Sequence, residues 1–225
     1  LPLLLALLVY LHIVALHKVG SNNPDGVEIK KQKDADGKPL DGIPFHPYYT
    51  VKDTFGVGVF LTVYLAIVFF LPELGGWFLE KDNFAPADIL QTPPDIVPLW
   101  YLTPYYSILR AVTFEWLPGG AKLWGVIAMA AAIVIFFFLP WLDRSRVRSI
   151  RYRGWMYKTM LTLFAVTFVM LGYLGTKNPG HVDLIWFKNV TWAQIGLVIY
   201  FAFFLLMPIY TRLDRTYAEP DRLTK

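Results

Sequence analysis

Histidines are the first candidates for chemistry in this chain, which has four of them and no cysteine. His12 and His17 lie at the end of an apolar run, and five residues of helix turn their rings about 140° apart. The two imidazoles therefore cannot bind one metal together. If His12 binds iron, its partner must come from another helix, as for a haem held between two histidines. The alternative is a packing residue held by a hydrogen bond, and the spacing leaves both open.

A second candidate site joins the two ends of a polar loop. His17 is followed by Gly20 and Ser21, which begin a helix stop and turn, and the loop returns through Lys52 and Asp53. Both ends of a loop between neighbouring helices lie at the same membrane depth, so His17 and Asp53 could face one another. Such a pair could donate the two protons that quinone reduction requires. The alternative is a helix-capping carboxylate and a solvated histidine.

A third candidate is the aromatic and apolar segment around Pro98, Leu99, Trp100 and Tyr101. These side chains are suited to enclosing a flat ring with an isoprenoid tail, and the tyrosines at 101, 105 and 106 could donate hydrogen bonds. An amphipathic core helix would have a similar sequence, so this segment alone does not distinguish a ligand-binding site from core packing.

Composition indicates the environment in which these residues work. Of 225 residues, 56% are hydrophobic and 17% are charged, and the mean hydropathy is +0.44. A soluble domain has about 25% charged residues, so a membrane protein is predicted. The lack of cysteine excludes disulfides, thiolate catalysis, cysteine-ligated iron–sulfur clusters and c-type haem attachment on this chain.

Apolar runs predict the elements that must position these side chains. Leu1–Leu16 is shorter than the roughly 20 residues that cross a bilayer, and we expect it to be the end of a longer helix, with the chain a carboxyl-terminal fragment. Four further runs are long enough to span the membrane: 54–71, 121–142, 155–174 and 192–210. The predicted fold is all-α, a truncated helix plus four transmembrane helices, with a long membrane-surface loop over 72–120 between the second and third helices.

Basic residues orient these spans. Fifteen of the 21 Lys and Arg lie in residues 17–53, residues 143–154 and the tail from 212, whereas the alternate connections, 72–120 and 175–191, hold four. This asymmetry predicts a cytoplasmic carboxyl terminus by the positive-inside rule.

Four segments together resemble cytochrome b, the membrane subunit of the bacterial quinol:cytochrome c oxidoreductase. They are LHIVALHKVGSNNP at 11–24, PFHPYYTVKD at 44–53, DIVPLWYLTPYYSILRAV at 95–112 and WLDRSRVRSIRYR at 141–153. On this resemblance the chain matches the end of the family's fourth helix followed by its fifth to eighth.

The resemblance implies a role for individual positions. His12 would be an axial ligand of the haem b nearer the cytoplasm and so the iron ligand. His17, Ser21, Lys52 and Asp53 would form the quinone-reduction site. On the outer side, Pro98, Leu99 and Trp100 would bind quinol, with Tyr101 and Tyr106 close to the reacting ring. The family usually has glutamate where Leu99 stands, and leucine cannot accept a proton.

The resemblance also implies an electron-transport function. The full-length subunit would hold two haems b, oxidise ubiquinol outside, reduce ubiquinone inside and translocate protons, although the fragment would not act alone. Residues 1–53 would form the haem-helix end and reduction site, and 54–225 a four-helix domain with the oxidation loop. A histidine about two residues before Leu1 is expected upstream.

The resemblance implies partners too. They are a Rieske iron–sulfur protein, a cytochrome c1-type subunit, membrane lipid and a second copy of the complex, all in the bacterial inner membrane. Nucleic acid is not an expected partner. Two alternatives stay open: a non-haem subunit similar to the small subunit of the photosynthetic quinol:plastocyanin complex, and a transporter or channel. Few ionisable residues in the spans argue against the latter.

Overall fold

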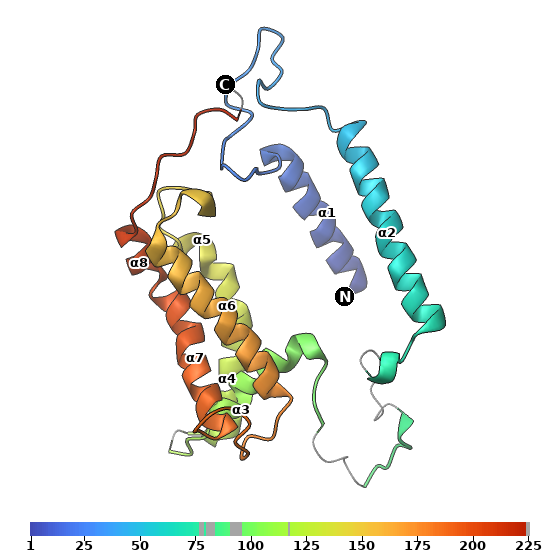
Figure 1. Cartoon of the computed structure of the whole chain (residues 1–225), viewed down its shortest axis with the longest axis vertical. Helices are drawn as coiled ribbons and strands as arrows, with labels where there is room; N and C mark the ends of the chain where they lie inside the picture. Colours follow the sequence, from blue (N-terminus) through green and yellow to red (C-terminus); the bar gives the residue numbers. More distant parts are fainter. Residues whose placement is uncertain (77–78, 80–83, 91–95, 117, 224–225) are drawn as a thin grey trace. The chain divides into compact units, whose positions relative to one another are not determined.

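The structure, a computed structural model, describes residues 1–76, 79, 84–90, 96–116 and 118–223. In these residues the regular structure is helical, and the isolated bridge between Lys33 and Pro39 is not part of a strand (Figure 1). The chain comprises two compact units. Unit 1 contains Leu1–Val27 and Asp95–Leu223, and unit 2 contains Glu28–Pro94 and Thr224–Lys225. The predicted all-α membrane fold is confirmed.

Two helices are apolar on every side. α1 (Pro2–Val19) belongs to unit 1 and α2 (Tyr48–Phe70) to unit 2, and neither has a buried residue. α1 ends where Gly20 adopts φ 86° and donates its N–H to the carbonyl of Leu16 at 2.7 Å. The helix extends three residues beyond the predicted run 1–16, to Val19, and its 18 residues are long and apolar enough to cross a membrane by length and composition.

Two spans match the predicted runs closely. Residues 120–142 form α4 (Gly120–Val134), a 3₁₀ turn η4 (Ile135–Phe138) and α5 (Leu139–Leu142), and together they are long and apolar enough to cross a membrane. Pro140 in the first turn of α5 explains the tightened turn before it, since proline cannot donate to the preceding helix. α6 (Trp155–Gly175) crosses as a single helix.

The last predicted span is not continuous. Residues 192–210 were expected to form one helix, but α7 (Asn189–Leu205) and α8 (Met207–Leu213) meet at Leu206 with a bend of 58°. Pro208 lies in the first turn of α8, where its missing N–H and its ring prevent α7 from continuing. Tyr210 is buried after the bend and donates its hydroxyl to the carbonyl of Phe203 at 2.9 Å.

A short helix holds the core of unit 1 together. α3 (Thr103–Ala111) follows the 3₁₀ turn η3 (Trp100–Leu102) and packs against α4, α6 and α7. Its buried residues form one stripe: Thr103, Pro104, Ser107, Ile108 and Ala111. The largest buried side chains around it are aromatic or aliphatic: Tyr200, Phe204, Leu171 and Leu174. The segment 72–120, predicted as a surface loop, thus contains a packed helix.

Candidate functional site

The segment before α3 presents aromatic rings from a fixed turn. Leu99, Trp100 and Tyr101 are exposed by 52%, 78% and 51%, and the rings of Trp100 and Tyr101 meet edge to face at 5.7 Å. The turn is closed by the N–H of Leu102, which donates to the carbonyl of Leu99 at 2.8 Å. The hydroxyl of Thr103 donates to the carbonyl of Trp100 at 2.7 Å. The side chains of the predicted quinol-binding segment are therefore accessible, and hydrogen bonds fix the backbone turn that carries them.

α3 carries this segment against the end of α6. Thr103 is 3% exposed, and its carbonyl lies so near Gly175 that a Cβ there would be 2.1 Å from the oxygen. Only glycine allows backbones to approach in this way. The beginning of α3 and the last residue of α6 therefore fix each other, and with them the direction in which the aromatic segment leaves the bundle.

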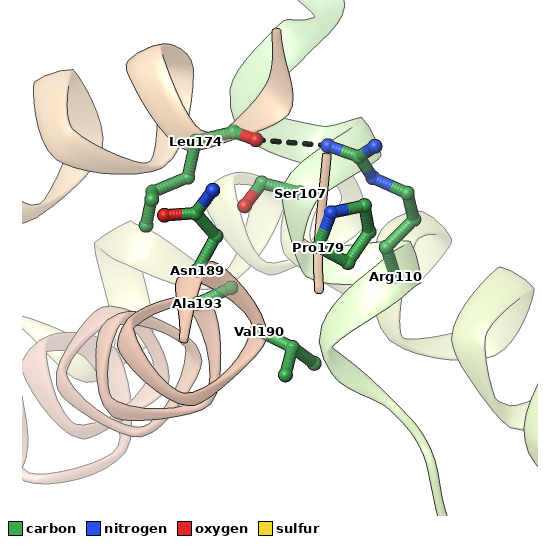
Figure 2. Close-up of a pocket in the computed structure, with 7 residues that line it drawn as sticks. All are labelled: Ser107, Arg110, Leu174, Pro179, Asn189, Val190 and Ala193. Carbon is green, nitrogen blue, oxygen red and sulfur yellow. Dashed lines mark hydrogen bonds between the residues drawn. The ribbon is translucent and has the colours of Figure 1, made fainter. Parts of the chain in front are cut away.

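Arg110 at the other end of α3 makes the second tie to α6. Its Nη2 donates to the carbonyls of Leu174 at 2.8 Å and Gly175 at 2.9 Å, and Figure 2 draws the first of these bonds. A cation suits this position because helix carboxyl ends carry unsatisfied carbonyls and partial negative charge. The same guanidinium lies 4.4 Å from the centre of the Tyr106 ring. Tyr106, predicted to approach quinol, is thus held by Arg110.

A small hollow lies beside these residues and is shown in Figure 2. Ser107 and Arg110 face Asn189 across it, and the space inside it that a water molecule can occupy is about 10 Å³. Ligand pockets for drug-sized molecules are about 300–1,000 Å³, so this hollow is too small for a quinone ring and tail. Asn189 is 1% exposed and donates its Nδ2 to the carbonyl of Asn178 at 2.8 Å and to Asp183 Oδ2 at 2.6 Å. It organises the connection between α6 and α7.

The residues predicted for the other membrane side are divided between the two units. His12 and His17 lie on α1, and Ser21 follows its end, in unit 1. Lys52 and Asp53 lie in the second turn of α2, in unit 2. The Nζ of Lys52 lies 5.5 Å from the centre of the Tyr49 ring. Whether these residues form one quinone-reduction site stays a prediction, as does the functional division at 53/54.

His12 fits one half of an axial haem pair. It is exposed on an apolar helix, and among the described residues no hydrogen bond or ion pair engages its imidazole. The hydrogen-bonded packing role therefore has no support in this part of the chain. No group of three or more His, Asp or Glu that could hold a metal ion is found among the described residues. A single imidazole suits a macrocycle that already supplies four nitrogen ligands.

A polar junction connects the turn after α1 to the loop between α5 and α6. We use this name for residues 23–27, 143–154 and 214–219. Asp25 pairs with Arg151 Nη1 at 2.7 Å and accepts a hydrogen bond from the Tyr152 hydroxyl at 2.9 Å. This hydrogen bond to Asp25, with a smaller contribution from burial, raises the pKa of Tyr152. The hydroxyl of Ser149 donates to the carbonyl of Pro24.

Further bonds bring the tail into the junction. Glu219 Oε1 accepts the backbone N–H groups of Arg148 at 2.7 Å and Ser149 at 2.8 Å. Asp214 Oδ2 accepts the N–H of Gly154 at 2.7 Å. Arg153 is 7% exposed and pairs with Asp143 at 2.7 Å. The arginine-rich loop 143–154, whose charges predict the orientation of the spans, is thus also held by specific hydrogen bonds and ion pairs.

Sequence reasoning missed three residues that shape these sites. Arg110, Gly175 and Glu219 were not among its candidate residues. Glycine at the end of an apolar span would have been the signal for Gly175. Nothing local identifies Glu219, because its partners are 70 and 71 residues away.

Comparison with known proteins gives one consistent family. Residues 86–201 match the family described as Cytochrome b(C-terminal)/b6/petD. The chain is 53% identical to "Cytochrome b" of Allochromatium vinosum, with 100% of this chain and 53% of the relative covered. It is 40% identical to "Cytochrome b/c1" of Bradyrhizobium diazoefficiens, with 100% of this chain and 29% of the relative covered.

A solved structure agrees. A chain of "Hyperthermophilic respiratory Complex III" is 35% identical, with a TM-score of 0.76, covering 94% of this chain and 48% of that one. The chain thus spans about half the length of the cytochrome b relatives it matches.

Proposed function

Because the chain belongs to the cytochrome b(C-terminal)/b6/petD family, we propose that it is part of the membrane subunit of a respiratory quinol:cytochrome c oxidoreductase. The subunit oxidises ubiquinol on the outer side of the bacterial inner membrane, reduces ubiquinone on the cytoplasmic side and translocates protons. The basic residues of 17–53, 143–154 and the tail support a cytoplasmic carboxyl terminus.

The observation that carries this proposal is the aromatic segment at the start of α3. Trp100 and Tyr101 expose their rings, while the turn beneath them is fixed by Thr103 and by the contact of α3 with Gly175. A fixed base with open aromatic faces is what a flat, two-electron substrate needs for stacking and orientation. Pro98 and Leu99 complete the wall of this quinol site.

The outer reaction at this segment needs a proton acceptor. Oxidation of quinol removes two protons, and the aliphatic side chain of Leu99 can accept neither. The phenols of Tyr101 and Tyr106 can donate or accept hydrogen bonds to the quinol hydroxyls, and Arg110 over the ring of Tyr106 holds one of them. The acceptor at this position is therefore another group of the complex or water.

The opposite reaction takes up two protons. His17 and Asp53 would donate hydrogen bonds to the two quinone carbonyls, with Asp53 protonated when it does so, and Ser21 would add a hydroxyl donor. Lys52, one residue before Asp53, would help to supply protons from the water side. Histidine suits this task because its pKa lies near physiological pH.

His12 would hold the iron of the haem b on this side, with the opposite ligand supplied by another helix. When bound, haem b supplies a one-electron carrier between the two quinone sites. The full-length subunit would hold two such haems. The chain's own contribution would be the imidazole of His12, and the apolar side chains of α1 would help to keep water from the iron.

The assembly follows from the same comparisons. The similar solved chain comes from a respiratory Complex III, and one similar protein is named cytochrome b/c1. We propose a Rieske iron–sulfur protein and a cytochrome c1-type subunit as partners, in a dimeric complex surrounded by lipid. The non-haem alternative is less favoured, because similarity to cytochrome b extends over the whole chain, including the segment that forms α1.

Two tryptophans in the 72–120 segment allow a matched test. Trp100→Ala removes a ring from the proposed site, whereas Trp116→Ala removes one that is equally exposed, 79% against 78%. In the full-length subunit within its complex, Trp100→Ala should slow quinol:cytochrome c reduction by roughly tenfold or more, about 1.4 kcal/mol of lost orientation. Trp116→Ala should stay near the parent rate. Equal rates in both variants would contradict the proposed site.

A further inference from the structure

The tail closes over the turn that follows α1. Glu219 Oε1 accepts two consecutive backbone N–H groups, from Arg148 at 2.7 Å and Ser149 at 2.8 Å. The same oxygen covers Gly26, where φ is +76° and a Cβ would lie 2.7 Å from it. A side chain at this position would displace either the tail or the turn. Glu219 therefore contacts both the loop between α5 and α6 and the turn after α1.

Three successive residues of the turn are fixed to the same surface. The carbonyl of Pro24 accepts from the Ser149 hydroxyl, Asp25 pairs with Arg151, and Gly26 lies under Glu219. The turn is also braced internally, since Asn23 accepts the N–H of Val27 at 3.1 Å and donates to its carbonyl at 2.6 Å. A turn held at every residue has little freedom to shift as a unit.

α1 gains little packing of its own from the described chain. None of its residues is buried, so apolar contact within the chain does little to set where its last turn lies. His17 is in that last turn, and Ser21 is three residues before Pro24. The fixed turn thus provides a stable reference point close to both side chains.

We propose that Glu219 is a positioning residue for the quinone-reduction site. It acts through Ser149 and the turn 23–27 on His17 and Ser21, and it does not touch quinone itself. This inference rests on the proposed function, in which His17 and Ser21 bind the quinone. Its new element is that the tail, about 200 residues from the site in sequence, sets the site's geometry.

The test compares three variants of the full-length subunit in its assembled complex. Glu219→Ala removes the acceptor, Glu219→Gln keeps a carbonyl oxygen at the same place, and Asp221→Ala removes an exposed acid from the same tail. Re-oxidation of reduced haem b by added ubiquinone reports the inner reaction. First-turnover reduction of the cytochrome c acceptor by ubiquinol reports the outer one. Backbone amide exchange over residues 20–28 and 147–150 reports the junction directly.

Glu219→Ala should raise the KM for ubiquinone in the inner reaction roughly tenfold and speed amide exchange in both segments, with the outer reaction unchanged. Glu219→Gln and Asp221→Ala should resemble the parent. An unchanged inner reaction despite faster exchange would overturn the proposal, and so would an equal loss of both reactions, which indicates a general structural role.

A second variant covers the case in which Glu219→Ala does not assemble. Arg151→Gln leaves the tail intact but breaks the ion pair with Asp25, and it should give the same selective loss of the inner reaction. If it does not, the proposal fails. His17→Ala separates this result from the proposed function: an unaffected inner reaction in that variant would refute His17 as a quinone ligand, whatever Glu219 does.

Discussion

The carbonyl of Thr103 lies against Gly175 at a distance that leaves no room for a side chain. A Cβ at Gly175 would be 2.1 Å from that oxygen, whereas a Cβ at Gly172, one turn earlier on α6, would meet its nearest neighbour at 3.5 Å, an ordinary contact. Both glycines face the start of α3. Their difference separates a requirement for close backbone approach from a simple preference for small residues.

We predict that Gly175→Ala destabilises the protein and Gly172→Ala does not. The first must push α3 from α6, at a cost of about 1–3 kcal/mol or more for overpacking. The second gains helix propensity, up to about 1 kcal/mol, at no steric cost. Apparent thermal midpoints of the full-length subunit measure both. A midpoint of Gly175→Ala equal to that of Gly172→Ala would show that the two helices separate freely.

Arg110 should not be replaceable by lysine. Its Nη2 bonds two carbonyls at the end of α6 while its plane covers Tyr106, and a lysine ammonium cannot reproduce this geometry. Arg110→Lys should cost about 1–3 kcal/mol in stability. The control is Lys177→Met, which removes a cation lying 5.1 Å from the centre of the Tyr173 ring, and it should change stability by less than about 0.5 kcal/mol. Denaturation in detergent measures both, and a larger loss in the control would contradict the assigned role.

His12→Ala in the full-length subunit should remove the absorbance of one haem b and leave that of the other. The reason is that a haem with one axial imidazole missing loses its low-spin spectrum or is not retained. His181→Ala is the control, because the described hydrogen bonds of His181 involve only its backbone: its N–H donates to the carbonyl of Asn178 at 3.2 Å, and its carbonyl accepts from the N–H of Asn189 at 2.8 Å. Redox difference spectra give the result. Two intact haems in His12→Ala would exclude ligation.

The backbone of Trp186 adopts a conformation that is unfavourable for residues other than glycine. Its φ is 70°, and the N–H of Phe187 donates to the carbonyl of Ile185 at 3.0 Å across it, which forms a strained γ-turn. The ring is 86% exposed. Trp186→Gly should therefore stabilise the isolated subunit by about 1 kcal/mol, because glycine adopts positive φ freely.

Val182→Gly serves as the comparison, since Val182 lies in the same connection without positive φ and glycine there should destabilise. Thermal midpoints decide between them. If both substitutions destabilise equally, the Trp186 ring contributes more through contact than its conformation costs.

Most of the spans could be predicted because apolar length is a local property. The run 155–174 became α6 with a difference of one residue, and 121–142 differed equally little. α2 begins six residues earlier than its apolar core, at Tyr48, because Lys52 and Asp53 are compatible with a helix even though they interrupt the hydropathy. The bend at Leu206 required attention to Pro208, which the hydropathy of 192–210 conceals.

The arrangement of the sites was less predictable. The number of arginines in 143–154 is enough to predict an orientation, but it does not predict their partners. Asp25 pairs with the side chain of Arg151 and Glu219 accepts the N–H of Arg148, and both acids are distant in sequence. Likewise, the tie between α3 and α6 needs Thr103 and Gly175 to meet, and neither residue type indicates its partner. Spacing identifies side chains that could do chemistry, whereas tertiary packing determines which of them share a surface.

The Glu219 contact also has a consequence for the order of biosynthesis. The Ser149 hydroxyl and the Pro24 carbonyl meet across 125 residues of chain, and the neighbouring N–H groups receive their acceptor only when residue 219 has been made. Chains emerge from the ribosome amino end first, and contacts between distant segments form late. The turn after α1 can therefore reach its final rigidity only after residue 219 has been synthesised, when all the helices between the turn and the tail have already been made.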